Sequence, residues 1–197
     1  MQAREHKYPL KPMRPGHIDR IEFEYIRHGT QCLIANFEVA TGQVIAPTLG
    51  ETRTEPDFVA HIVQTIATDP DARWIFIVDR LDIHMSASLV HWVAATLGDS
   101  QDLGKKEHHG ILKSTQTRRT YLTDEGHRIR FVYLPKHASW LNQVEIWFSI
   151  LVRRLLKRAS FASIDELRER VLRFIEYFNA TLAKPFKWTY TGKVLAA

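Results

Sequence analysis

Two acidic residues, Asp79 and Glu145, stand where strands and helices commonly present chemical groups. Asp79 ends the apolar run 74–78 in "WIFIVDRLDIH", and the carboxyl end of a strand is the edge at which open α/β sheets hold ligands. Glu145 belongs to a polar helix ridge with i, i+3, i+4 spacing: Asn142, Glu145, Ser149 and Arg153. Two such carboxylates would repel unless a divalent cation such as Mg²⁺ lay between them, and paired metals support phosphoryl transfer. The alternative is that Asp79 only ends a strand and that Glu145 is a solvated helix charge, and spacing alone leaves both open.

The segments around Asp79 alternate between strand and helix patterns. Two β-rich runs within 31–49 flank Ala40, Thr41 and Gly42 and predict a hairpin. Apolar residues at helical spacing predict helices over 54–70 and 86–98. Strands are expected at 74–78 and 129–134. The run 74–78 is apolar on both faces, so we expect helices to cover both sides of its sheet.

The C-terminal third has a helical pattern. A helix from Ser139 should bury one apolar face: Leu141, Val144, Phe148, Leu151 and Leu155. A second helix should begin at Ser163, where Ser163 and Glu166 form a capping box. Its apolar stripe is Ile164, Leu167, Val171, Ile175 and Phe178. Together these elements predict an α/β domain with helices packed on a sheet.

We divide the chain by these patterns. Residues 1–20 are broken by prolines and are expected to be irregular. Residues 21–183 should form the domain, with a basic insertion of loops and short helical turns at about 99–128. Residues 184–197 should form an irregular tail.

Composition narrows the function classes. The formal net charge is +5, and a basic balance favours a polyanionic partner such as nucleic acid. The single cysteine, Cys32, excludes an internal disulfide and a zinc site built on several cysteines. No apolar run is long enough to cross a bilayer and no signal-peptide pattern is found, so we expect a soluble, intracellular protein. The motifs of serine hydrolases, P-loop enzymes and zinc proteases are absent.

Basic residues follow the predicted site. We expect a DNA-binding track on either side of Glu145 and in the tail, with a second group in the insertion. The alternative for each residue is a solvated helix face. His84 and His137 flank the two acids, and a structural or DNA-contact role fits them better than metal binding, because Mg²⁺ prefers oxygen. The track comprises Lys136, Arg153, Arg154, Lys157, Arg158 and Lys187, and the insertion group comprises Lys105, Lys106, Lys113, Arg118 and Arg119.

Several segments closely resemble one family in the same order along the chain. These are "EYIRHGTQCLIANFEVATGQVI", the Asp-x-x-x-x-His arrangement of "DRLDIH", "LPKHASWLNQVEIWFSILVRRLL" and "AKPFKWTYTGK". They resemble bacterial insertion-sequence transposases related to mariner, from about residue 8 to the end. The resemblance implies a DDE catalytic domain on an RNase H-like (retroviral-integrase-like) mixed sheet flanked by helices.

In such enzymes three acids bind two Mg²⁺ (or Mn²⁺) ions for DNA cleavage and strand transfer. The partner implied is duplex DNA, at transposon ends and target, bound by a homodimer in the bacterial cytoplasm at the nucleoid. Carried over by position, Asp79 is the second acid and Glu145 the third, with Asn142, His84 and His137 around them.

The sequence also departs from that family. The first acid should lie in an Asp-Glu pair just upstream of Met1, on a central strand that this chain lacks, so we expect two open strand edges. Relatives usually have Asn after the second acid, whereas Arg80 here can pair with Asp79 and compete with a metal. Asp82 also stands where Asn is usual and is a candidate spare carboxylate.

We therefore expect a transposase catalytic domain that is inactive as this chain alone. One alternative is a non-catalytic DNA-binding or regulatory remnant that pairs with an intact transposase. Another is a remnant that does not fold, which cooperative unfolding would exclude.

Overall fold

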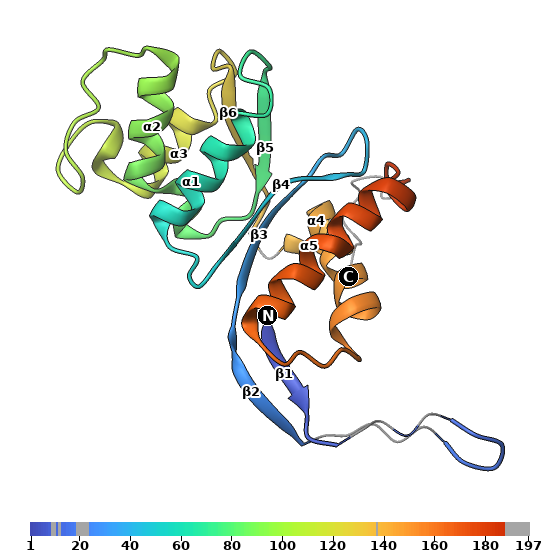
Figure 1. Ribbon diagram of the computed structural model, residues 1–197. Coiled ribbons are helices and arrows are strands. Elements are labelled where there is room, and N and C mark those ends of the chain that lie inside the picture. Colours follow the sequence, from blue (N-terminus) through green and yellow to red (C-terminus); the bar gives the residue numbers. More distant parts are fainter. Residues whose placement is uncertain (9–10, 12, 19–23, 137, 188–197) are drawn as a thin grey trace, which may run out of the picture.

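Strands and helices alternate along the chain in an α/β arrangement, as the sequence predicts (Figure 1). The computed structural model describes residues 1–8, 11, 13–18, 24–136 and 138–187. The strands are β1 (Gln2–His6), β2 (Tyr25–Thr30), β3 (Cys32–Phe37), β4 (Val44–Gly50), β5 (Trp74–Val78) and β6 (Ile129–Tyr133). The helices are α1 (Glu55–Ile66), α2 (Ala87–Leu97), α3 (Thr115–Leu122), α4 (Gln143–Leu151) and α5 (Ile164–Thr181). Short turns are η1 (Asp82–Met85), η2 (Ile111–Lys113), η3 (Ser139–Leu141) and the π-helical η4 (Val152–Leu156).

The described strands pair two by two. β1 pairs with β2 and β3 with β4, both antiparallel, while β5 and β6 are parallel with Trp74 opposite Ile129 and Val78 opposite Tyr133. The predicted hairpin is therefore confirmed as β3–β4. Within the described residues no strand lies hydrogen-bonded between β3 and β5, so each has an open edge.

Two hydrophobic cores organise the molecule, and the elements around them form two groups in Figure 1. We call the elements around the first core the first lobe; they are α1, α2, α3, β5 and β6, and Phe58, Leu89 and Phe131 lie inside. The second lobe comprises β1 to β4, α4 and α5, and its core includes Trp147, Leu167 and Phe178. Since the strand β3 supplies Ile34 to the first core and Leu33 to the second, it joins the two lobes.

Three expectations differ from the structure. Gln2–His6 forms β1 inside the segment expected to be irregular, because it pairs with β2. The prediction that helices cover both faces of 74–78 is wrong, since Ile75 and Ile77 are 49% and 48% exposed. The insertion contains a true helix, α3, whose Tyr121 and Leu122 join the first core.

The C-terminal helices are partly as predicted. The α5 stripe is buried at Leu167, Val171, Ile175 and Phe178, and the Ser163 side chain caps the helix by accepting from the Glu166 amide. The return bond of the predicted capping box differs, because the Glu166 carboxylate accepts from the Ala162 amide. In α4, however, the buried side chains are Trp147 and Leu151. Of the predicted face only Leu151 is fully buried, while Phe148 and Leu155 pack partly buried against the same core. α4 begins at Gln143, four residues later than Ser139, and passes into η4.

No helix among the described residues is both long enough and apolar enough to cross a membrane.

A polar seam joins the β3–β4 hairpin to α1. His61 is 1% exposed, and its Nδ1 lies 2.8 Å from the Thr48 hydroxyl. Asn36 of β3 donates to the Thr65 hydroxyl at 2.6 Å, and this hydroxyl donates to the His61 carbonyl at 2.7 Å. Burial lowers the pKa of His61 to about 4, from an ordinary value of 6.5. The imidazole is therefore neutral in the folded protein at pH 7.

The seam predicts a pH-dependent stability. As pH falls below 6.5 the unfolded chain takes up the His61 proton before the folded protein does, so stability is lost toward pH 4. Between pH 7 and 4.5 the wild type should lose about 2 kcal/mol more unfolding free energy than His61→Gln. Urea unfolding at both pH values measures this difference. Equal losses in the two proteins would show that His61 is not the titrating group.

Candidate functional site

Asp79 directly follows β5, at the carboxyl edge of the parallel β5–β6 pair. Its side chain is 46% exposed. Its Oδ1 lies 2.8 Å from Nδ1 of His84 and accepts from the Leu81 amide at 3.1 Å. Both contacts use the same carboxylate oxygen. The structure thus brings together two of the predicted site residues, Asp79 and His84, at an accessible strand end.

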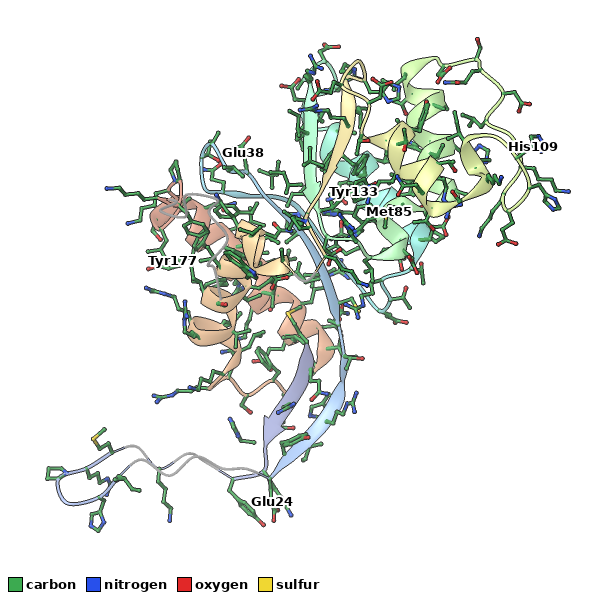
Figure 2. The ribbon with its side chains drawn as sticks, turned by 180° about the vertical axis from the view of Figure 1, so that it is seen from behind. Glu24, Glu38, Met85, His109, Tyr133 and Tyr177 are labelled. Atoms are coloured by element: carbon green, nitrogen blue, oxygen red, sulfur yellow. The ribbon has the colours of Figure 1, made fainter. Side chains whose placement is uncertain are left out.

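The turn after Asp79 is held through its main-chain carbonyls. The Tyr133 hydroxyl donates to the His84 carbonyl at 2.7 Å, and burial raises the pKa of Tyr133, so it stays a donor. The His84 ring packs on Phe58 with centroids 4.4 Å apart. Tyr133 and Met85 are labelled near this turn in Figure 2. The position of the His84 ring beside Asp79 is therefore fixed from both β6 and α1.

Arg118 fastens the same turn to the insertion. Its Nε donates to the Met85 carbonyl at 2.7 Å, and one terminal nitrogen donates to the Leu112 carbonyl at 2.9 Å. The residue is only 9% exposed. The prediction that Arg118 contacts DNA is therefore wrong, because a guanidinium buried on two carbonyls does not reach a phosphate. Nothing in the sequence distinguishes it from Arg119.

Arg80 bridges the ends of β5 and β6. Its Nε donates to the Leu134 carbonyl at 2.9 Å. The Asp79 carboxylate instead contacts His84 and the Leu81 amide. The expectation that Arg80 competes at Asp79 is thus not supported by this arrangement. Asp82 is exposed at the start of η1.

Glu145 lies in the first turn of α4 and is exposed. Asn142, expected around the acids, is the N-cap of this helix: its side-chain oxygen accepts from the Val144 amide at 3.4 Å. α4 belongs to the second lobe, whereas Asp79 follows a strand of the first. Glu145 and Asp79 therefore sit on elements of different cores. His137 lies outside the described residues.

Carboxylate oxygens suit Mg²⁺ or Mn²⁺, and both Asp79 and Glu145 are accessible to solvent. Within the described residues, however, no three acidic, histidine or cysteine side chains gather closely enough to hold an ion. The carboxylate oxygens of Asp79 and Glu145 suit such a metal. A complete metal site would need further ligands besides these two side chains.

The predicted cationic track is exposed after α4. Arg153 and Arg154 lie on η4, a π-helical turn closed by the bond from the Lys157 amide to the Val152 carbonyl at 2.8 Å. The sequence shows no signal for this wide turn, which often occurs near functional sites. The remaining predicted cations are also exposed: Lys136, Lys157, Arg158 and Lys187.

The Arg118 contacts predict a large stability effect. Arg118→Met would leave the Met85 and Leu112 carbonyls without their charged donor. The unfolding free energy should fall by about 2–4 kcal/mol. Urea unfolding measures it, with Arg119→Met as the control because Arg119 is adjacent and partly exposed. Equal losses in the two variants would contradict the structural role of Arg118.

Comparison with known protein families identifies the superfamily to which the chain belongs. The family model described as "DDE superfamily endonuclease" matches residues 2–168. A search of curated proteins and a search of solved structures each gave no match. Endonucleases of this superfamily normally act on DNA with divalent metal ions, and the α/β fold described above agrees with their RNase H-like domain. Because the match spans most of the chain, this protein belongs to the DDE endonuclease superfamily.

Proposed function

We propose that the chain is a transposase catalytic domain of the mariner-related bacterial insertion-sequence type, acting on duplex DNA. The observation that carries the proposal is the accessible carboxylate of Asp79 at the end of a parallel strand, inside a superfamily match that includes Glu145. The basic net charge and the exposed cations beyond α4 support a DNA substrate.

In this proposal Asp79 and Glu145 are ligands of divalent metal ions. Bound metal would supply the activation of a water or 3′-hydroxyl and the stabilisation of charge at the phosphodiester. His84 would orient the Asp79 carboxylate through the 2.8 Å contact to Oδ1. Tyr133 and Phe58 would in turn hold His84 in place.

A non-catalytic DNA-binding or regulatory role is the second candidate. It is favoured by the absence, among the described residues, of a group of three acidic, histidine or cysteine side chains that could hold a metal ion. Asp79 and Glu145 also lie on elements that pack around different cores. Both candidate functions require binding to duplex DNA, but only the first includes DNA cleavage. Metal-free binding that survives Asp79→Asn is expected under the second.

The incomplete ligand set predicts that the purified chain does not cleave DNA by itself. With Mg²⁺ or Mn²⁺, nicking of a supercoiled plasmid should stay at background for the wild type, Glu145→Gln and the Asp82→Asn control. Robust nicking that disappears in Glu145→Gln but not in Asp82→Asn would show that the described residues do assemble an active site.

The same chain, expressed with the codons that precede Met1 in the genome, tests the transposase proposal. If those codons encode a strand ending in Asp-Glu, Mn²⁺-dependent nicking should appear. It should fall by about a hundredfold in Asp79→Asn and in Glu145→Gln, the upper end of the loss seen when even a hydrogen-bond partner of a metal ligand is removed. A frameshift or stop codon there, or an extended chain without cleavage, would favour the non-catalytic role.

The η4 cations predict salt-dependent DNA binding. Arg153→Gln combined with Arg154→Gln should weaken binding to a short duplex and lower the slope of log K against log salt by about 2. Fluorescence anisotropy over a salt series measures the slope. Arg168→Gln combined with Arg173→Gln is the matched control, since both arginines are exposed on α5 and the charge change is identical. Equal effects of the two double variants would show that only net charge matters.

A further inference from the structure

The insertion contains a closed loop, Leu103–Leu112, that we call the tongue. The Leu112 amide donates to the Leu103 carbonyl at 3.0 Å, which closes its base. Nearer the tip, Lys105 and His109 exchange two backbone bonds, of 3.0 Å and 3.2 Å. Because two levels of backbone bonds tie its two sides together, the tongue is a defined structure, although it lies in a segment with little sequence pattern.

Two glycines allow the sides of the tongue to touch. Gly104 has φ +82, and a Cβ there would lie 2.2 Å from the His109 carbonyl oxygen. A Cβ on Gly110, which has φ +74, would lie 2.7 Å from the Gly104 Cα. Any side chain at either position would force the two backbones apart. The narrow shape of the tongue therefore depends on Gly104 and Gly110.

The tip of the tongue exposes basic side chains. All five residues from Lys105 to His109 are exposed, and Figure 2 shows His109 at the outer end. The tip carries one acid, Glu107. Two acids lie nearby: Asp102 accepts from the Gly104 amide at 2.9 Å, and Glu55 accepts from the Ser88 amide at 3.0 Å and is also close enough to Lys106 for the two charges to interact. Hydrogen bonds from Ser88, with a smaller contribution from Lys106, hold the pKa of Glu55 below its usual range.

The tongue is anchored to the edge that carries Asp79. Arg118 bonds both the Leu112 carbonyl at the tongue base and the Met85 carbonyl in η1. η1 also contains His84, which contacts Asp79. Through Arg118, the base of the tongue is thus linked to the turn that holds the His84 ring beside Asp79.

We propose that the tongue is a phosphate-backbone clamp that holds duplex DNA beside Asp79, with Lys105 and Lys106 as its principal cations. The proposal rests on the proposed function for its choice of partner, since DNA is the substrate of this superfamily. It adds a contact on the first lobe, separate from the η4 cations on the second. A rigid loop suits this role because little conformational entropy is lost when it binds.

Binding of a ~30-bp duplex, measured by anisotropy without metal, tests the charges of the tongue. Lys105→Gln combined with Lys106→Gln should weaken binding about tenfold at ~100 mM salt and lower the salt slope by about 2. The Arg168→Gln and Arg173→Gln pair on α5 carries the same charge change and should have a smaller effect. Equal effects of the two pairs would overturn the clamp.

The shape of the tongue is tested without changing its charge. Gly104→Ala should weaken duplex binding, because the new Cβ meets the His109 carbonyl and opens the tip. Gly98→Ala is the control: Gly98 has φ +68 in the same lobe, but a Cβ there meets nothing within 4 Å. It should bind DNA like the wild type. Equal binding by both glycine variants, each shown to be folded by cooperative unfolding, would overturn the need for a closed tongue.

These outcomes separate the clamp from the proposed function. Normal binding by the lysine variant overturns the clamp and leaves the transposase assignment standing, because the α4 and η4 residues are unaffected. Failure of the extended chain to cleave DNA overturns catalysis and leaves the clamp standing. A wild type that binds no duplex at low salt overturns both.

Discussion

The alternation of β3 is the constraint on which both lobes depend. Successive side chains of a strand point to opposite faces, and in β3 Ile34 packs against the first core while Leu33, Ala35 and Phe37 pack against the second. Asn36 adds a hydrogen bond to α1. One six-residue strand thus connects the lobe that carries Asp79 to the lobe on which α4 places Glu145. A one-residue shift in its register would exchange the two sets of side chains and disrupt both cores.

One face of the parallel strand pair β5–β6 remains uncovered in this two-lobed arrangement. Ile75 and Ile77 alternate with the buried Phe76 and Val78, yet they remain about half exposed because α4 and α5 pack on the second lobe. An apolar face next to an open β5 edge is the surface that a neighbouring strand or helix usually covers. The run of apolar residues in the sequence correctly indicated a strand, although only one of its faces is buried. It held no information about which elements lie close enough to bury it.

Local sequence patterns predicted most helices and strands. They failed where contacts with residues distant in the sequence determine the structure. The β3–β4 hairpin, α5 and the strand that ends at Asp79 follow from periodicity, capping and turn residues within short windows. β1 did not, because its structure depends on pairing with β2, beyond a proline-broken segment. At the site, the neighbouring arginines 118 and 119 look alike in sequence, but the direction of each side chain on α3 decides which is buried. Asn142 was expected around the two acids, and that role stays a prediction; its observed contact is that of a helix cap.

The Asp79 edge is organised independently of Glu145. Three donors hold the backbone around it by main-chain carbonyls: Arg80 on Leu134, Tyr133 on His84 and Arg118 on Met85. All three belong to the first lobe, so this half of the site needs nothing from the second to keep its geometry. Glu145 lies on α4, which packs on the second core, and β3 contributes side chains to both cores. On the proposals made above, a duplex held by the tongue on one lobe and by Arg153 and Arg154 on the other would contact both lobes at once. DNA would then be both the substrate and a ligand that links the two halves of the site.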